Sequence, residues 1–131
     1  MAYTWHPMDK SDEKRLPKPL VWMGNSLETV RSFPSAVKDE IGFALSQAQV
    51  GSKHLNAKPM KGFGPGVFEI VSDYRRNTFR AVYMVRLGEK IYVLHAFQKK
   101  SKSGITTPKS EIALIKDRLK RAIELHKEQE N

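Results

Sequence analysis

The feature that most limits the fold of this chain is the stretch from Gly66 to Lys102. It contains short runs rich in β-branched and aromatic residues, and the segments between them, 73–77 and 87–90, carry turn-forming residues. Short connections join antiparallel neighbours, so the stretch predicts an antiparallel meander. The expected strands are Val67–Val71, Thr78–Arg86 and Ile91–Phe97.

Helical patterns flank the meander in the sequence. Apolar residues recur with helical spacing between Pro34 and Gly51, and again after Thr107. A short strand is expected at Pro19–Met23 and a short helix at Leu27–Ser32. The pattern predicts an α+β protein, a small antiparallel sheet with an N-terminal helical hairpin and a C-terminal helix.

The length of 131 residues fits one domain with its own core. Residues 1–17 are polar, with mixed charges and two prolines, so we expect them to form a flexible N-terminal arm. The remaining residues, 18–131, are expected to form the single domain.

Strand alternation assigns side chains to the two faces of the sheet. In the second strand, Phe79, Ala81, Tyr83 and Val85 share an apolar face that should meet the helices. Arg80 lies on the other face, which we expect to be partly open to solvent. In the third strand the alternation groups His95 with apolar neighbours: Ile91, Val93 and Phe97. A lone histidine in such a place is more often a satisfied core residue than a catalyst.

The net charge of +9 is concentrated in the middle of the chain. Residues 53–102 hold eleven basic and three acidic side chains, whereas residues 1–52 are balanced and residues 103–131 carry +1. A localised excess indicates a polyanionic partner, most simply a nucleic acid. A basic surface without a partner is the alternative. The composition of the irregular stretch 52–65 fits a binding loop and a solvated connector equally well.

Several classes of site have no support in the sequence. There is no cysteine, and the four histidines, His6, His54, His95 and His126, lack the spacing of metal ligands. We therefore expect neither a metal site nor a cofactor. The N-terminus lacks the apolar core of a signal peptide, and no apolar run could span a bilayer. The expected location is the cytoplasm, with no membrane partner.

Four motifs together resemble a known family. They are KPMKGFG at 58–64, FEI at 68–70, LHAFQKK at 94–100, and a helix that begins after Thr107-Pro108. This order resembles the phage-derived Gp49-like, or HigB-like, branch of the RelE/ParE toxin superfamily, over about Lys18 to His126. The resemblance implies a small twisted antiparallel sheet with the helices described above, and a toxin of a type II toxin–antitoxin module.

The resemblance favours one activity and leaves two alternatives. RelE-like members cut mRNA, usually on the ribosome, so a metal-independent mRNA endoribonuclease that inhibits translation is favoured. ParE-like members poison DNA gyrase with the same fold, and a basic RNA- or protein-binding module without catalysis is the third hypothesis. The implied partners are mRNA on the ribosome and a cognate antitoxin, a small helix-turn-helix protein similar to HigA.

The resemblance also implies roles for individual residues. Arg80 matches the strand arginine that contacts the scissile phosphate, and Lys99 and Lys100 match the basic pair after the last strand. His95 matches a position where some relatives place a polar active-site residue. The remaining candidates would bind RNA, Phe97 by stacking on a base and the others by charge: Lys61, Arg75, Arg76 and Lys102.

The first strand departs from the RelE pattern. RelE has lysines there, whereas this sequence has Glu69 and places its basic residues, Arg75 and Arg76, in the following turn. Glu69 could act as a base, or it could form a structural ion pair with Arg75, Arg80 or Lys100. We favour the ion pair.

Overall fold

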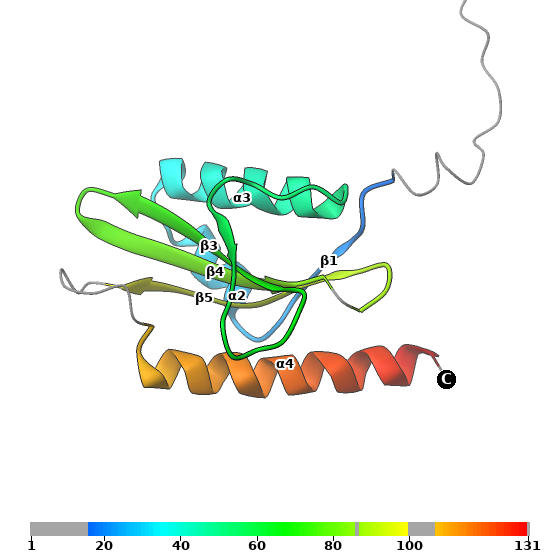
Figure 1. Cartoon of the computed structure of the whole chain (residues 1–131). Helices are drawn as coiled ribbons and strands as arrows, with labels where there is room; N and C mark the ends of the chain where they lie inside the picture. The colour runs from blue at the N-terminus through cyan, green and yellow to red at the C-terminus, as the bar shows by residue number, and fades with distance from the viewer. Residues whose placement is uncertain (1–15, 86, 100–106, 131) are drawn as a thin grey trace, which may run out of the picture.

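The sheet lies between two layers of helix (Figure 1). The computed structural model describes residues 16–85, 87–99 and 107–130. In chain order its elements are β1 (Leu20–Trp22), α2 (Ser26–Arg31), α3 (Ser35–Gln49), β2 (Ala57–Pro59), β3 (Val67–Tyr74), β4 (Asn77–Met84), β5 (Ile91–Lys99) and α4 (Lys109–Glu130). The chain is α+β, as predicted. Within the described part, no helix is long and apolar enough to cross a membrane.

The five strands follow the order β1-β5-β4-β3-β2. The predicted meander is confirmed, because β3, β4 and β5 pair antiparallel with their neighbours in sequence. The predicted strand near Pro19 is present as β1, which pairs parallel with β5. The stretch 52–65 is not wholly irregular, since it contains β2, which pairs with β3. β2 was not predicted because three residues that end in a proline are too few to show the alternation of a strand.

The turn between β3 and β4 is tighter than the predicted segment 73–77. Only Arg75 and Arg76 lie outside the strands, and both have positive φ angles, +48° and +70°. Such angles suit the right-handed twist of a two-residue hairpin but are uncommon for residues other than glycine. The Arg75 guanidinium lies 5.2 Å from the centroid of the Tyr74 ring. The hairpin therefore ends in two exposed arginines.

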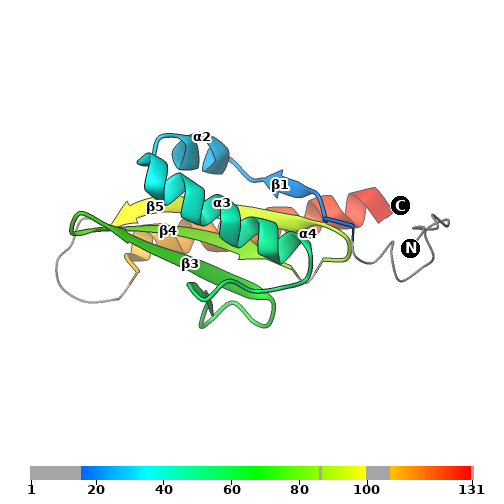
Figure 2. The same ribbon diagram turned by 90° about the horizontal axis from the view of Figure 1, so that it is seen from above.

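The face of the sheet toward α3 carries an apolar core, as predicted. Phe79, Ala81 and Tyr83 are buried there against α3, and the ring centroids of Phe33 and Phe79 are 4.8 Å apart. Seen from above, α3 runs across the strands and α2 lies beside it (Figure 2). The helical spacing predicted the buried positions of α3, which are Val37, Ile41, Ala44, Leu45 and Ala48.

The opposite face is not partly open to solvent, which corrects our expectation for Arg80 and its neighbours. Helix α4 covers this face (Figure 1), and Val82 and Met84 are fully buried against it together with Ile115 and Ala122. The apolar stripe of α4 needs a partner, and this face supplies it. Arg80 itself is buried.

A β-bulge in β5 changes the expected faces of its second half. Val82 pairs with His95 but Tyr83 pairs with Val93, so Leu94 is an extra residue. Ile91 and Val93 face α3 as predicted, but Leu94 and His95 both face α4. The prediction that His95 and Phe97 share a face with Ile91 and Val93 is therefore wrong.

Candidate functional site

Charged and polar side chains share the space between the sheet and the first half of α4 with apolar ones. We call this group the polar layer. The sheet contributes Glu69 from β3, Arg80 from β4, and His95 and Lys99 from β5, and α4 contributes Glu111 and Arg118. Strand pairing places the four sheet residues on one face across three neighbouring strands.

Arg80 and Glu69 form a buried ion pair. The distance from Arg80 Nη1 to Glu69 Oε1 is 2.6 Å, and the two side chains are 8% and 13% exposed. The Thr107 hydroxyl lies 3.4 Å from the second carboxylate oxygen of Glu69. This is the ion pair we favoured for Glu69. A buried pair is costly to desolvate, so it is held only where the geometry is tight.

His95 is held between two charged residues of α4. Its Nδ1 accepts a hydrogen bond from Arg118 Nη1 at 2.8 Å, because a guanidinium can only donate. Its Nε2 therefore carries the proton and donates to Glu111. Burial lowers the pKa of His95, and Arg118 lowers it further, against the opposing effect of Glu111. His95 is thus a buried, neutral histidine whose two ring nitrogens are both engaged.

Arg118 joins α4 to two other parts of the chain. It donates to the carbonyl of Leu94 in the bulge at 3.2 Å and to Asn25 Oδ1, just before α2, at 2.9 Å. The guanidinium lies so close to Gly24 that a Cβ there would be 2.7 Å from it. Sequence analysis missed Arg118 and Glu111. Both lie on an amphipathic helix, where charged residues usually face solvent, so no local pattern distinguishes them.

Lys99 and Phe97 are brought to the same face as Arg80. Phe97 pairs directly with Arg80 and Lys99 with Thr78, so Lys99 lies two positions beyond Arg80 toward the hairpin end of the sheet. Both are buried, and the Phe97 ring stacks on His95 at 5.4 Å. The other two lysines of this group, Lys100 and Lys102, lie outside the described residues.

The sequence profile of the phage-derived Gp49-like proteins matches residues 28–120. The chain belongs to this Gp49-like family. The resemblance stated from the sequence motifs is thereby confirmed for the Gp49-like branch. Among curated proteins, none matches the sequence.

Two solved structures are similar to this Gp49-like protein. One is the Escherichia coli toxin RelE in the free state, with two arginines replaced by alanine: the TM-score is 0.51 and the identity 16%, over 81% of this chain and 98% of that one. The other is the RelBE2 toxin–antitoxin complex of Mycobacterium tuberculosis, with a TM-score of 0.44 and 11% identity over 66% and 95%. The first likeness shows a shared fold, so the predicted RelE-like architecture is confirmed.

The remaining RNA-binding candidates of the Gp49-like protein lie apart from the polar layer. Arg75 and Arg76 are exposed in the hairpin turn, and Lys61 is exposed in the loop before β3. The structure therefore separates buried charges under α4 from exposed charges at the rims of the sheet. No group of three or more histidine, cysteine, aspartate or glutamate side chains is suitably placed for a metal ion among the described residues.

Proposed function

We propose that this Gp49-like protein is the toxin of a type II toxin–antitoxin module and cleaves mRNA on the ribosome in the cytoplasm. The observation that carries the proposal is the Glu69–Arg80 pair, which lies on one face of a RelE-like sheet with Lys99 nearby. The excess of basic residues in 53–102 supports a polyanionic substrate. Family membership and the likeness to the toxin RelE support the toxin assignment.

The chemistry proposed for the site requires no metal. The 2′-hydroxyl of RNA attacks the adjacent phosphorus, a P–O2′ bond forms, and the P–O5′ bond breaks. The products are a 2′,3′-cyclic phosphate and a 5′-hydroxyl. The reaction needs a proton acceptor for the 2′-hydroxyl, donors for the charge that develops on the phosphorane, and a proton donor for the leaving oxygen.

The Glu69–Arg80 pair supplies the first two requirements. In the structure the Glu69 carboxylate holds the guanidinium that would bind a phosphate. Once α4 gives access to this face, a scissile phosphate would bind the same guanidinium, because Arg80 can donate several hydrogen bonds in a planar fork. Its binding would release the Glu69 carboxylate beside the reacting phosphate, where it can accept the proton of the 2′-hydroxyl.

The three remaining catalytic candidates, Lys99, Lys100 and His95, take different roles in this proposal. The ammonium groups of Lys99 and Lys100 supply positive charge and the proton for the 5′ oxygen. His95 donates its only N–H to Glu111 in a hydrogen bond, so we assign it as a positioning residue that fixes the start of α4 over the site. A neutral imidazole is a poor acid, so His95 would act as a catalytic acid only after taking up a second proton on Nδ1, to which Arg118 now donates.

The proposal is tested by expressing the protein in bacteria and mapping the 5′ ends of cellular RNA. Purified protein at high concentration should also cut a minimal RNA and leave a 2′,3′-cyclic phosphate. Arg80→Lys keeps a cation opposite Glu69 but loses the planar fork, so the cleavage rate should fall by about a hundred- to a thousandfold. Lys127→Gln, on the exposed end of α4, is the control. A 5′-phosphate product, or growth arrest with intact mRNA and induced DNA damage, would exclude the proposal.

The module proposal has a separate test. Co-expression with the product of an adjacent helix-turn-helix gene should give a soluble complex and suppress toxicity. If wild-type protein is toxic but no neighbouring gene product binds it, the toxin–antitoxin assignment fails while the nuclease assignment stands.

A further inference from the structure

Most of the large apolar side chains that are exposed in the described residues lie on one side of the sheet, at or next to α3. Five large hydrophobic residues are exposed, and only Leu114 belongs to α4. The other four lie on α3 or on the segments next to it: Leu16, Phe43, Val50 and Leu55. Leu55 is 94% exposed, and Val50, which follows α3, is 51% exposed. A gathered set of this kind is typical of an interaction surface, whereas single exposed residues are not.

Backbone and side-chain contacts place the segments that carry these residues next to one another. The amide of Lys18 donates to the carbonyl of Gln49 at 2.9 Å, which places the segment after Leu16 beside the end of α3. The loop that follows α3 turns back along the helix. His54 packs edge-on against Phe43 with ring centroids 5.5 Å apart, and Asn56 donates to Glu40. We call this region, from Leu16 to Lys18, α3 residues 43–49 and residues 50–55, the α3-end surface.

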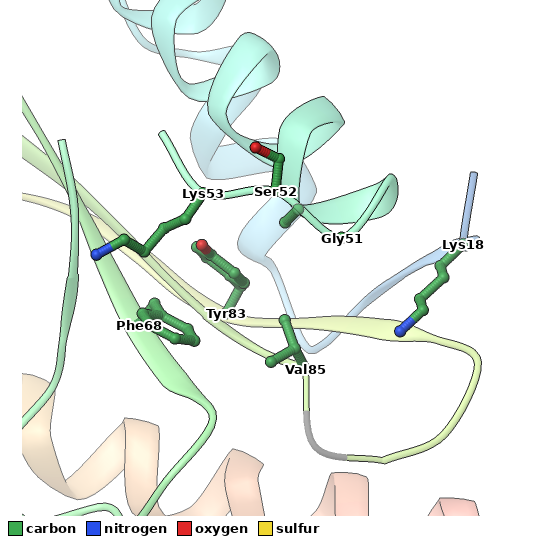
Figure 3. Close-up of a pocket in the computed structure, with 8 residues that line it drawn as sticks. Lys18, Gly51, Ser52, Lys53, Phe68, Tyr83 and Val85 are labelled. Carbon is green, nitrogen blue, oxygen red and sulfur yellow. The ribbon is translucent and has the colours of Figure 1, made fainter. Parts of the chain in front are cut away.

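A pocket of about 320 Å³ opens within the α3-end surface (Figure 3). Its floor is formed by Phe68 of β3, Tyr83 of β4 and Val85, which directly follows β4. Phe68 and Tyr83 pair across the strands, and their rings stack at 5.5 Å. Figure 3 shows Lys18 and Lys53 at opposite sides of this floor. The space is large enough for one aliphatic or aromatic side chain, and both rims carry positive charge.

The lining of the pocket selects the chemistry of its occupant. None of the described residues that line it is acidic, so a negatively charged ligand is favoured. Burial raises the pKa of Tyr83 to about 12, so its hydroxyl stays protonated as a donor at neutral pH. Figure 3 shows this hydroxyl directed toward the Lys53 side chain. Tyr83 is itself buried, so its ring offers no open face on which a nucleic-acid base could stack.

We propose that the α3-end surface docks an acidic segment of a protein partner that places an apolar anchor residue in this pocket. The anchor would contact Phe68 and Val85, and flanking carboxylates would pair with Lys18 and Lys53. The exposed Val50 and Leu55 extend the apolar contact, which a protein segment can cover and an RNA strand cannot. An RNA ligand is the alternative that the test must exclude.

The proposal becomes more specific if it rests on the proposed function. The partner would then be the antitoxin, and this segment would bind the side of the sheet opposite the polar layer. Glu69 and Arg80 lie under α4 on the other face. Docking of this segment would therefore leave the face that carries the proposed catalytic residues untouched.

A random peptide library displayed on phage and selected against the full-length protein tests the docking surface without a known partner. Selected peptides should be acidic with an aliphatic or aromatic anchor. Val50→Asp and Lys53→Glu should each weaken their binding by about tenfold or more. The matched controls on α4, Leu114→Asp and Lys127→Glu, should leave binding unchanged. Equal melting temperatures would show that the variants fold.

Three results would overturn the inference. These are selected peptides that bind equally well to all four variants, a failure to select any peptide, and a pocket that binds a short single-stranded RNA in preference to the peptides. A second measurement separates this inference from the proposed function. When expressed in bacteria, Val50→Asp and Lys53→Glu should arrest growth like the wild-type protein, but co-expression of the antitoxin should no longer suppress this toxicity. Absence of toxicity in the wild type would refute the function and leave the peptide result valid.

Discussion

The two faces of the sheet are built by different means. Toward α3 the side chains are apolar and pack in one core cluster that includes Phe33, Ile41 and Phe79. Toward α4 the core is apolar only in part, and the polar layer occupies the rest. The stability of the apolar face depends on filling its volume, whereas the stability of the polar layer depends on pairing its charges and hydrogen-bonding groups. The α3 face therefore holds the fold by packed volume, whereas the α4 face also relies on charged pairs, which are the contacts that a ligand would have to replace under the proposed function.

The largest effects should come from removing one large group from either face. Phe79→Ala leaves a cavity, and Arg80→Ala leaves the Glu69 carboxylate buried without its cation. Each should lower the free energy of unfolding by about 3–5 kcal/mol, measured by urea denaturation.

A second substitution then distinguishes the faces. Adding Glu69→Leu to Arg80→Met should recover most of the stability, because apolar groups of similar size can replace a buried ion pair. Adding Phe33→Ala to Phe79→Ala should lower it further. A Glu69→Leu/Arg80→Met protein as unstable as Arg80→Ala would contradict this account of the polar layer.

Two glycines provide the next comparison. Gly24→Ala should destabilise by about 1–3 kcal/mol, because the new Cβ would meet the Arg118 guanidinium and the backbone has a φ of +53°. Gly42→Ala, on the open side of α3, meets no atom within 4 Å and should stabilise by up to about 1 kcal/mol. Thermal denaturation should show a lower melting temperature for Gly24→Ala and a higher one for Gly42→Ala. If Gly24→Ala is neutral, Arg118 does not hold α4 in the way described.

The pH dependence of stability below pH 6.5 tests the polar layer through His95. The pKa of His95 is lowered in the folded protein from an ordinary value of 6.5, so the unfolded chain takes up a proton that the folded chain resists. Stability should therefore be fully present above pH 6.5 and fall as the pH is lowered toward 5, by at most about 1.4 kcal/mol per pH unit. Urea denaturation of His95→Gln should show a shallower fall. If the stability of the wild type and of His95→Gln fell in parallel with decreasing pH, His95 would not be the cause of the fall.

The smallest effect concerns two tyrosines on opposite faces. The Tyr92 hydroxyl, on the α4 face, is buried with no hydrogen-bond partner among the described residues. Tyr92→Phe should therefore raise stability by about 1 kcal/mol. Tyr83→Phe, whose hydroxyl reaches the α3-end pocket, should change it by less than about 0.5 kcal/mol. Differential scanning calorimetry measures both changes. A larger gain in stability for Tyr83→Phe than for Tyr92→Phe would contradict the comparison.

The parts of the fold that were predicted correctly are those fixed by local pattern. The meander follows from short strands joined by turns, and α3 follows from its helical spacing. The parallel pairing of β1 with β5 is non-local, because nearly seventy residues separate the strands, so no local pattern reveals it. The cover over Arg80 was missed for the same reason. Whether a strand face meets water depends on α4, an element far along the chain.

The candidate site was predicted in part. Strand alternation correctly placed Arg80 away from the apolar face, and the run of lysines correctly located Lys99 near it. The same alternation failed for His95, because a bulge leaves no trace in residue types. Glu111 and Arg118 were missed because an amphipathic helix has charged residues on most of its surface, and only tertiary packing shows which of them are buried.

The extra residue at Leu94 makes the site depend on the number of residues in β5 as well as on their identity. If β5 kept the same residues but paired without the bulge, regular alternation would turn His95, Phe97 and Lys99 toward α3. The sequence motif would be intact while its side chains left the site. When family members are aligned, a gap shifted by one position in this strand would therefore assign the wrong residues to the same role. The length of this strand has to be compared before any residue is matched.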